Sequence, residues 1–458
     1  MERRDFVRCA GLAVLALSVG ASAARTHGQS GSADRPNVVL IVTDDVGYAD
    51  FGSYGARDVR TPNIDRLAKQ GVRLTDFYAA PQCTPTRAAL ITGRYQQRVL
   101  LERALGSVGP ALEQGLAATG RSLPQLLKNN GYATGLIGKW HLGFKPEFGP
   151  NAHGFDYFYG FLSGYIDFYT HTRGGDGLPD LHENGTAVAD SGYMTDLITR
   201  HAVRFVEQQS TAGAAKPFFL EVTYNAAHWP FQPPDHYSKA PNNAAFQSAA
   251  DSIPATRKDY VAMIERADAG VGEIVAALAR LGLTNNTLVI FTNDNGGEWL
   301  SNNAPFFHRK DTLWEGGIRV PAIFRWPGHL PAGKTSSQAG LTMDLTATIL
   351  AATKTAVPAQ AGLEGIDLLP LLAGNAPLER TLFWRIAVPT RQQRAVRKGN
   401  WKLLVDGDDL LLFDLRADPG ERRDLAAQRP GLVRQLRDLL AAWEKDVDAE
   451  AATHAPGR

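Results

Sequence analysis

Three continuous runs of apolar and β-branched residues constrain the fold of this chain more than any other feature. They lie at residues 37–42, 218–222 and 288–291, with weaker runs at 134–137 and 321–326. A run that is apolar at every position fits a strand buried on both faces, as in a parallel sheet. Helical patterns separate the runs, at residues 63–69, 122–129, 193–208 and 258–281. This alternation predicts an α/β fold, a three-layer sandwich around a central, mostly parallel sheet.

The C-terminal part of the chain follows a different pattern. From about residue 356, short strand-like runs alternate with turn residues, at 382–385, 394–396, 401–405 and 411–414. One face of a closing helix is then marked by Leu432, Val433, Leu436, Leu439, Leu440 and Trp443. We therefore predict a large α/β domain at residues 36–355. A C-terminal α+β subdomain at 356–458 would hold a small antiparallel sheet with a packed helix.

The N-terminus has the pattern of an export signal. Arg3-Arg4-Asp5-Phe6-Val7 resembles a twin-arginine motif, and Ala21-Ser22-Ala23 has the small-residue pattern of a cleavage site. We predict a twin-arginine-type signal peptide at 1–23, a linker at 24–35, and export, to the periplasm in a bacterium. The apolar stretch is too short to span a bilayer, so we expect no stable membrane insertion. An uncleaved anchor is the alternative.

Charge and cysteine content limit the partners and the redox chemistry. The formal net charge of +1 gives no reason to expect nucleic acid as a partner. The two cysteines are Cys9 and Cys83, and Cys9 would leave with the signal peptide. The remaining cysteine cannot form an internal disulfide, and a lone thiol in an exported protein is a candidate reactive group.

Cys83 opens a segment that we interpret as the start of a helix. Pro85 suits the first turn, good helix formers follow, and Gly93 can end the helix. Cys83 would then lie at the positive end of the helix dipole, where an anion is favoured. Arg87 follows one turn later on the same face and can hold a charged group beside it. A buried cysteine next to a helix cap is the simpler interpretation.

Polar residues also stand where three of the predicted strands end. They are Asp44 and Asp45, Asp294 and Asn295, and Asn225 with His228. Ligands of α/β sheets bind beyond the C-terminal ends of the strands, so we expect these residues to converge. The first four offer only oxygen ligands, which suit Ca²⁺ or Mg²⁺ rather than zinc. A helix cap and a turn would explain the same residues without a metal.

Basic residues form a second group of candidates. Lys139 and His141 alternate in an extended segment and so point the same way, and Lys310 lies in a polar loop. A solvated lysine is the simpler interpretation of either lysine. Residues 145–190 are rich in Gly, Tyr, Phe and His without periodicity, and we predict an active-site loop region there. Ordinary loop or surface positions are expected for His153, His171, His182 and His236, and a solvated helix face or a cap for Glu265 and Asp268.

Together these motifs resemble the type I sulfatases of the alkaline phosphatase superfamily, which include arylsulfatases and N-acetylgalactosamine-6-sulfatases. Cys83-Thr84-Pro85-Thr86-Arg87 matches the C-x-P-x-R signature, with Thr86 where the family often has Ser. The other matching stretches are residues 42–45, 61–65, 92–94, 138–143, 228–230, 294–296 and 314–317. They cover nearly the whole chain after the signal peptide, and the resemblance implies an alkaline phosphatase-like sandwich.

The resemblance implies a mechanism and a role for each residue. Cys83 would be oxidised to formylglycine, whose hydrate attacks sulfur and later expels sulfate. The implied metal ligands are Asp44, Asp45, Asp294, Asn295 and the modified Cys83, with Ca²⁺ as the family's usual metal and Mg²⁺ as an alternative. Sulfate ester cleavage needs cations around the non-bridging oxygens and an acid for the leaving oxygen. Arg87 would hold the hydrate, Lys139, His228 and Lys310 would grip the sulfate, His228 or Lys310 would protonate the leaving oxygen, and His141 would help the aldehyde to re-form.

The implied partners are a sulfated small molecule or glycan, and a formylglycine-generating or other sulfatase-maturing enzyme. One alternative is a phosphonate or phosphate ester hydrolase with the same modified residue. Another is a non-catalytic protein that binds a sulfated glycan. The sequence favours neither a carbohydrate sulfate nor an aryl sulfate as the substrate, because the aromatic residues of 145–190 could stack on a sugar or on an aryl ring.

Overall fold

The computed structural model describes residues 35–211, 216–235, 255–388 and 391–454. The predicted signal peptide at 1–23, nearly all of the predicted linker at 24–35, and His236 lie outside the described residues. Among the described residues, no helix is both long enough and apolar enough to cross a lipid bilayer.

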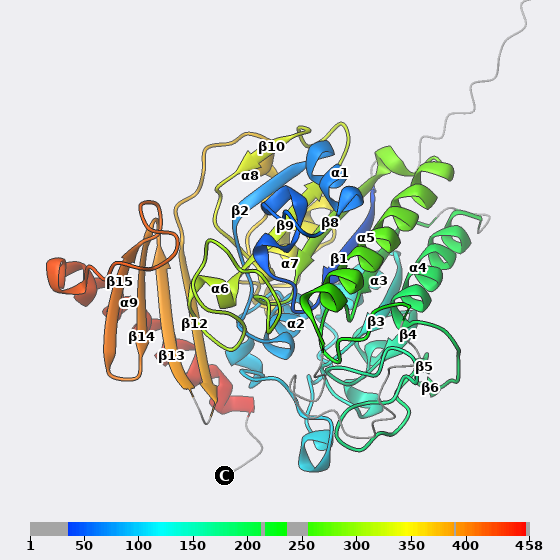
Figure 1. The fold of residues 1–458 in the computed structure, drawn as a ribbon, viewed down its shortest axis with the longest axis horizontal. Coiled ribbons are helices and arrows are strands. Elements are labelled where there is room, and N and C mark those ends of the chain that lie inside the picture. The colour runs from blue at the N-terminus through cyan, green and yellow to red at the C-terminus, as the bar shows by residue number, and fades with distance from the viewer. Residues whose placement is uncertain (1–34, 212–215, 236–254, 389–390, 455–458) are drawn as a thin grey trace, which may run out of the picture.

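A large sheet forms the centre of the molecule, and its middle strands are parallel (Figure 1). The strand order is β10-β2-β9-β8-β1-β7-β3-β4-β5-β6, with β11 paired to β2. The neighbours β8, β1, β7, β3 and β4 all run parallel, whereas β9 is antiparallel to both β8 and β2. The strands are β1 Asn37–Thr43, β2 Val72–Tyr78, β3 Ala133–Lys139, β4 Tyr157–Phe161, β5 His182–Glu183, β6 Thr186–Ala187, β7 Phe218–Thr223, β8 Thr287–Asn293, β9 Arg319–Arg325, β10 Lys334–Ser336 and β11 Gly340–Leu341.

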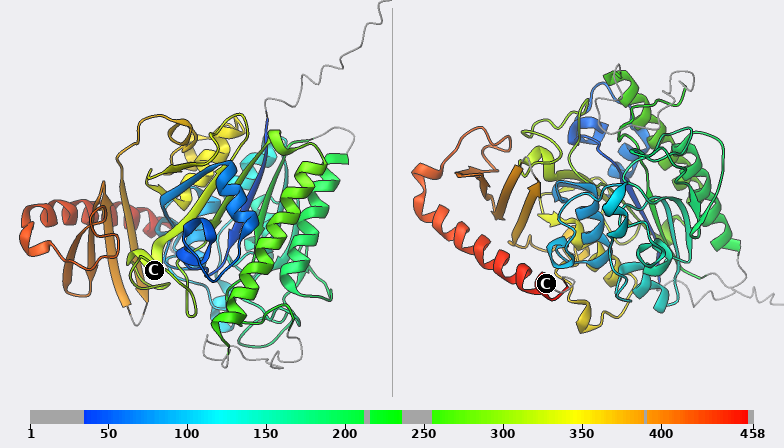
Figure 2. Two further views of the ribbon diagram at one scale, coloured as in Figure 1. Left: turned by 45° about the horizontal axis from the view of Figure 1, so that its top comes forward. Right: turned by 90° about the horizontal axis from the view of Figure 1, so that it is seen from below.

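Helices cover both faces of this sheet and complete the predicted three layers (Figure 2). Successive side chains of a strand point to opposite faces, so β1 places Val39 and Ile41 in one core and Val38, Leu40 and Val42 in the other. Helices α1, α4 and α5 pack on the first face, and α2, α3, α7 and α8 on the second. The helices are α1 Pro62–Gln70, α2 Cys83–Thr92, α3 Leu123–Asn129, α4 Met194–Thr211, α5 Arg257–Arg280, α6 Glu315–Ile318, α7 Thr342–Ala352, α8 Leu369–Ala373 and α9 Pro430–His454.

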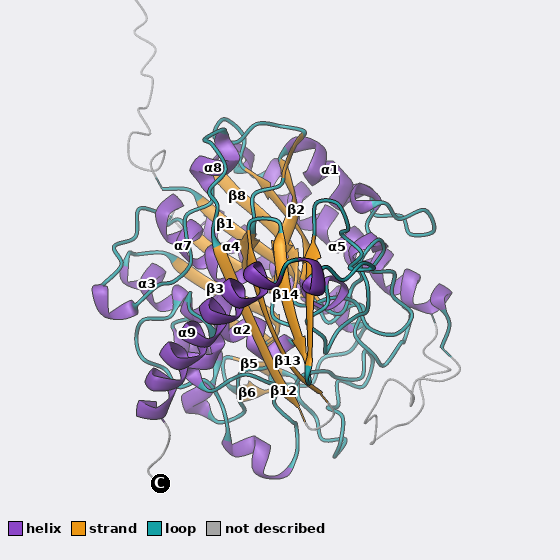
Figure 3. Cartoon of the chain, turned by 90° about the vertical axis from the view of Figure 1, so that its left-hand side faces the viewer, coloured by secondary structure: helices purple, strands orange, loops and turns teal. Residues whose placement is uncertain are grey.

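A separate four-stranded antiparallel sheet follows, with α9 packed against it (Figure 3). Its strands, in spatial order, are β12 Thr381–Val388, β13 Arg391–Lys398, β14 Trp401–Asp406 and β15 Asp409–Asp414. Leu436, Leu440 and Trp443 of α9 lie in the core that this sheet forms, as their helical spacing predicts. The sequence assigned residues 356–375 to the C-terminal subdomain. In the structure, Leu368 and Leu372 of this segment pack instead in the core under the large sheet.

Buried ion pairs join the two sheets. We call them the junction cluster, which consists of Asp76, Glu315, Arg319, Arg397, Lys402 and Glu421. Lys402 Nζ lies 2.9 Å from Glu315 Oε1 and 2.8 Å from Glu421 Oε1. The side chains of Lys402 and Glu315 have no exposed surface.

The prediction of 145–190 as a loop region was wrong in part, because it contains the sheet strands β4, β5 and β6. Strand β4 ends in Gly-Phe and lies under helices, so its aromatic residues fill the core instead of alternating with polar ones. Strand β2 was not predicted either. Its alternating polar and apolar residues are typical of a strand with one face less buried, which a search for continuous apolar runs does not find.

Candidate active site

The candidate residues meet beyond the C-terminal ends of four adjacent strands, β8, β1, β7 and β3. We call this group the strand-tip site. Parallel strands end at the same edge of a sheet, so residues far apart in sequence become neighbours there. The structure brings together all of the predicted metal ligands and catalytic residues, which are Asp44, Asp45, Cys83, Arg87, Lys139, His141, His228, Asp294, Asn295 and Lys310.

Cys83 is the first residue of α2, as predicted, and its Sγ lies 3.6 Å from Asp44 Oδ1. The helix ends where Gly93 takes a left-handed φ of 67° and donates its N–H to Ala89 O. Burial, together with the nearby Asp294 carboxylate, raises the pKa of the Cys83 thiol well above its ordinary value. An unmodified thiol at this position is therefore protonated at neutral pH and is a poor nucleophile.

Arg87 and Lys139 neutralise the carboxylates on the Cys83 side of the strand-tip site. Lys139 Nζ donates to Asp44 Oδ2 over 2.5 Å, and Arg87 Nη2 donates to Asp294 Oδ2 over 3.0 Å. Arg87 Nη1 also donates to Lys139 O over 2.9 Å, which fixes the guanidinium beside the end of β3. Burial and the nearby Asp294 still raise the pKa of Asp44 to about 7. A further cation beside Asp44 would therefore be stabilised.

Lys310 and His228 face the same oxygen of Asp45. Lys310 Nζ donates to Asp45 Oδ2 over 2.8 Å, and His228 Nε2 lies 3.4 Å from that oxygen. His228 Nδ1 donates to Trp229 O over 2.6 Å, which leaves Nε2 of the neutral ring unprotonated. Burial alone would raise the pKa of Asp45, but the ammonium groups of Lys310 and Lys139 hold it below its ordinary value. Asp45 is therefore a carboxylate in the folded protein.

One ring nitrogen of His141 forms a hydrogen bond, and the other has no hydrogen-bond partner among the described residues. Its Nε2 lies 2.9 Å from Leu105 O, and a carbonyl only accepts, so Nε2 carries the hydrogen. Burial, with Lys139 as the next cause, lowers the pKa of His141 well below its ordinary value, so the ring is neutral. Nδ1 has a lone pair and no hydrogen-bond partner among the described residues. His141 thus offers a buried proton acceptor.

Two buried oxygens of the strand-tip site, Asp294 Oδ1 and Asn295 Oδ1, also lack a partner in the described part of the chain. Burying such an oxygen without a partner is costly, so native proteins seldom do it without a ligand. Ligand atoms of Asp44, Asp45, Cys83 and His228 lie within 4.8 Å of one another. Carboxylates with free amide and carboxylate oxygens fit a hard divalent cation. His228 belongs to this group by position, although the sequence suggested a role on the substrate.

Asn225 is a residue of the strand-tip site to which the sequence assigned no role. It follows β7 and is 1% exposed, yet neither its Oδ1 nor its Nδ2 has a partner among the described residues. A buried amide with both ends free is unusual unless a ligand or water binds it. In the sequence, only its position after a predicted buried strand indicated that Asn225 could belong to the site.

Gly164 and Tyr165 were also missed as individual residues. A Cβ at Gly164 would lie 2.6 Å from His141 Cε1, so only glycine lets this segment approach His141 closely. The Tyr165 ring stacks on the His228 ring, with centroids 5.6 Å apart and planes 10° apart. It also contacts Trp229, at a centroid distance of 4.0 Å. One dipeptide of the 145–190 region therefore contacts both catalytic candidate histidines.

The remaining candidates lie away from the strand tips. Asp268 is 2% exposed, so it is not on a solvated face; it accepts hydrogen bonds from the N–H groups of Asn63 and Ile64 and so caps α1. Glu265 accepts a hydrogen bond from the N–H of Arg60. His153 and His171 are buried rather than at the surface, because each ring bonds a backbone carbonyl in a packed loop.

Comparisons with known proteins agree with this geometry. A family model described as Sulfatase matches residues 36–355, and one described as N-sulphoglucosamine sulphohydrolase, C-terminal, matches residues 304–446. N-acetylgalactosamine-6-sulfatase of Mus musculus is 32% identical over 94% of this chain and 88% of that protein. Arylsulfatase A of Bos taurus is 34% identical over 90% of this chain and 89% of its own. The crystal structure of Ps i-CgsB superposes with a TM-score of 0.81 at 34% identity, and the match covers 89% of this chain and 92% of that one.

Proposed function

The chain belongs to the sulfatase family and is a sulfuric ester hydrolase, and we propose that its nucleophile is a formylglycine made from Cys83. When present, the aldehyde hydrate would supply the attacking oxygen and a means of releasing sulfate afterwards. The observation that carries the proposal is the gathering of unpartnered buried groups around Cys83, on Asp294, Asn295, Asn225 and His141.

We propose that the strand-tip site also holds Ca²⁺, with Mg²⁺ as the alternative. Its ligands would be Asp44, Asp45, Asp294, Asn295 and the modified Cys83, and His228 is close enough to contribute. A divalent cation there would polarise the sulfate and favour an ionised nucleophile.

The other residues of the strand-tip site would bind the sulfate and move protons. Lys139 and Lys310 present ammonium groups that stabilise negative charge on the sulfate oxygens, and Arg87 holds the modified residue. Lys310 and His228 both lie at Asp45. Lys310 carries protons and can deliver one to the leaving alcohol oxygen. The sequence suggested His228 for the same role, but its neutral ring presents an unprotonated Nε2 there and can only accept a proton or bind a cation. The free Nδ1 of His141 can accept a proton when the aldehyde re-forms.

We propose a carbohydrate or aryl sulfate as the substrate. Relatives named N-acetylgalactosamine-6-sulfatase and arylsulfatase, and a structure of Ps i-CgsB in complex with k-i-k-neocarrahexaose, support this range. A phosphonate or phosphate ester hydrolase remains the second candidate, because the same cationic groups bind either anion. A non-catalytic protein that binds a sulfated glycan is the third.

Two further proposals concern the maturation and the export of the protein. We propose that a formylglycine-generating or other sulfatase-maturing enzyme oxidises Cys83. We also propose export, to the periplasm in a bacterium, on the basis of Arg3-Arg4 and Ala21-Ser22-Ala23. N-terminal sequencing of the protein from a native periplasmic fraction tests the export, which predicts a chain that begins after Ala23.

Peptide mass spectrometry of Cys83, on protein from its native host, tests the nucleophile. We expect an aldehyde in place of the thiol, and hydrolysis of para-nitrophenyl sulfate well above that of para-nitrophenyl phosphate. An unmodified thiol in active protein would contradict the formylglycine mechanism. Faster phosphate hydrolysis would favour the second candidate, and modified protein that binds sulfated glycans without hydrolysing them would favour the third.

A further inference from the structure

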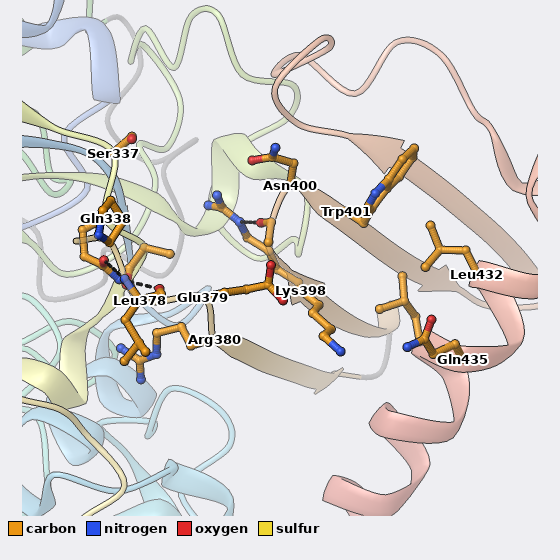
Figure 4. Close-up of a pocket in the computed structure, with 15 residues that line it drawn as sticks. Ser337, Gln338, Leu378, Glu379, Arg380, Lys398, Asn400, Trp401, Leu432 and Gln435 are labelled. Carbon is orange, nitrogen blue, oxygen red and sulfur yellow. Dashed lines mark hydrogen bonds between the residues drawn. The ribbon is translucent and has the colours of Figure 1, made fainter.

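A hollow of about 510 Å³ lies where the C-terminal sheet meets the edge of the large sheet (Figure 4). It has the size of a typical small-ligand pocket. The end of the β13–β14 hairpin lines it from one direction and the start of α9 from another, and the segment 377–380 closes the third side. Figure 4 shows Trp401 and Leu432 on one side, Gln338 and Leu378 on the other, and Lys398 between them.

The hairpin contributes both an aromatic residue and a cationic residue to the lining of this hollow. Lys398 and Trp401 are directly paired in the β13–β14 register, so their side chains lie on the same face of the sheet. Both are half-buried, and Leu432 and Gln435 of α9 line the hollow beside them. The guanidinium of Arg429 lies 5.5 Å from the centre of the Trp401 ring, which brings a second positive charge to it.

Several polar side chains of the hollow have unused hydrogen-bonding capacity. Within the described chain, no hydrogen bond or ion pair engages the side chains of Lys398, Asn400 or Gln435. The other two cations that line the hollow are committed, since Arg397 pairs with Asp76 and Arg380 with Asp344. The hollow therefore combines an aromatic surface, two exposed amides, the ammonium group of Lys398 and the exposed carboxylate of Glu379.

We propose that this hollow is a second carbohydrate site, which binds a sulfated polysaccharide chain. The C–H faces of a sugar ring pack on an aromatic surface, and hydroxyl groups pair with side-chain amides. The ammonium group of Lys398 forms a charge-assisted hydrogen bond to a sulfate. The proposal depends on the proposed function in one respect, namely that the natural substrate is a sulfated polymer.

The distance from the strand-tip site determines what such a site can do. At the other end of β13, Arg391 Nη1 donates to Asp311 O, next to Lys310, over 3.1 Å. Lys398 is seven residues further along the strand, which is about 24 Å at the usual rise per residue. A single sugar or an aryl sulfate cannot reach both places. The second site would therefore act on polymers alone, by raising their effective concentration at the strand-tip site.

Calorimetric titration of the full-length protein with chondroitin sulfate and with unsulfated chondroitin tests the proposal. Lys398→Glu reverses the free charge at a half-buried position, and Trp401→Ala removes the ring. We expect each variant to bind chondroitin sulfate about tenfold more weakly than the unaltered protein does. Lys258→Glu, which reverses an exposed lysine on α5 away from the hollow, is the control and should bind normally. Thermal unfolding of every variant identifies any loss of fold.

Unchanged binding in both folded variants would overturn the proposal, and equal weakening for unsulfated chondroitin would overturn the assignment to sulfate. Turnover of para-nitrophenyl sulfate should be the same in Lys398→Glu as in the unaltered protein. Absence of that turnover in the unaltered protein would contradict the proposed function and would leave the binding result to decide the second site by itself.

Discussion

Two buried clusters of charged residues in this protein have nearly the same composition. They differ in how many of their polar atoms have hydrogen-bond partners. The strand-tip site has three carboxylates, from Asp44, Asp45 and Asp294, and three cations, from Arg87, Lys139 and Lys310. The junction cluster also has three of each, from Asp76, Glu315 and Glu421, and from Arg319, Arg397 and Lys402. Both are almost fully removed from water.

The two clusters differ in what their polar atoms contact. In the junction cluster each carboxylate oxygen has a hydrogen bond or an ion pair. Glu421 Oε2 accepts the N–H of Glu315 over 2.6 Å. Glu421 Oε1 makes no hydrogen bond among the described residues, but it lies 2.8 Å from Lys402 Nζ. At the strand tips Asp294 Oδ1 and Asn295 Oδ1 have no hydrogen-bond partner among the described residues. Charge balance therefore does not distinguish a functional site from a structural one. Unused lone pairs and donors do, because they remain available for a ligand.

The largest effect that the comparison predicts is on activity. Cys83→Ala should lower kcat/KM for an aryl sulfate by at least about a thousandfold, because it removes the nucleophile itself. The change of free energy of unfolding should stay within about 2 kcal/mol, since only one sulfur is lost. Turnover assays and thermal unfolding measure the two quantities. Activity within tenfold of the unaltered enzyme would show that the nucleophile is elsewhere.

The second effect is on stability and concerns the junction cluster. Lys402→Met leaves Glu315 and Glu421 buried without their shared cation, and breaking a buried pair costs about 3–5 kcal/mol. Denaturant unfolding measures the loss. Lys398→Met, four residues away on the half-exposed end of β13, is the control and should change stability by less than about 0.5 kcal/mol. Equal effects of the two substitutions would mean that burial of Lys402 has no special importance.

Removal and re-addition of a metal should affect the strand-tip site and leave the junction cluster unchanged. Added Ca²⁺ at about a hundred times its dissociation constant should stabilise chelator-treated protein by about 2.7 kcal/mol, and it should restore turnover. Asp294→Ala removes a proposed ligand and should reduce both responses. Lys402→Met should keep the Ca²⁺-dependent gain in melting temperature, because the carboxylates of the junction cluster are paired with cations rather than with a metal. A Ca²⁺ response that Asp294→Ala leaves intact would place the ion elsewhere.

A smaller effect tests the contact between Tyr165 and His228. Tyr165→Ala should lower kcat for an aryl sulfate about threefold to tenfold, since an aromatic pair of this kind contributes about 0.5–1.5 kcal/mol. Tyr165→Phe keeps the ring and should restore most of the rate. If the phenylalanine variant is as slow as the alanine variant, the hydroxyl rather than the stacking is responsible.

The smallest effect is a pH dependence of stability. Burial raises the pKa of Glu421 to about 7, with Lys402 opposing the rise, whereas an unfolded chain has about 4.3. The stability that the neutral carboxyl contributes is complete below the unfolded pKa and is lost as pH rises through about 7. Glu421→Gln cannot ionise, so it should gain stability relative to the unaltered protein between pH 5 and 8. Parallel unfolding curves across that range would contradict the assignment.

Much of the fold could be predicted because hydrophobic burial leaves a local pattern. The runs at 37–42, 218–222 and 288–291 became β1, β7 and β8, since a strand buried on both faces must be apolar throughout. Strands β2 and β4 could not be found as continuous apolar runs. Strand β2 alternates polar and apolar residues, and β4 is a short aromatic segment. Their pairing with β9 and β3 establishes them as strands of the large sheet.

The candidate residues of the strand-tip site were visible in the sequence because strand ends and the Cys83 segment mark them locally. By itself the sequence determined the α/β class, the residue types at the strand tips and the membership of the family that those motifs indicate. Only the tertiary structure decided which polar atoms are satisfied and which stay free, which residues support His141 and His228, and how the two sheets are joined. The reason is physical: hydrogen-bond partners and ring contacts are formed between residues such as Tyr165 and His228, whose proximity no local pattern encodes.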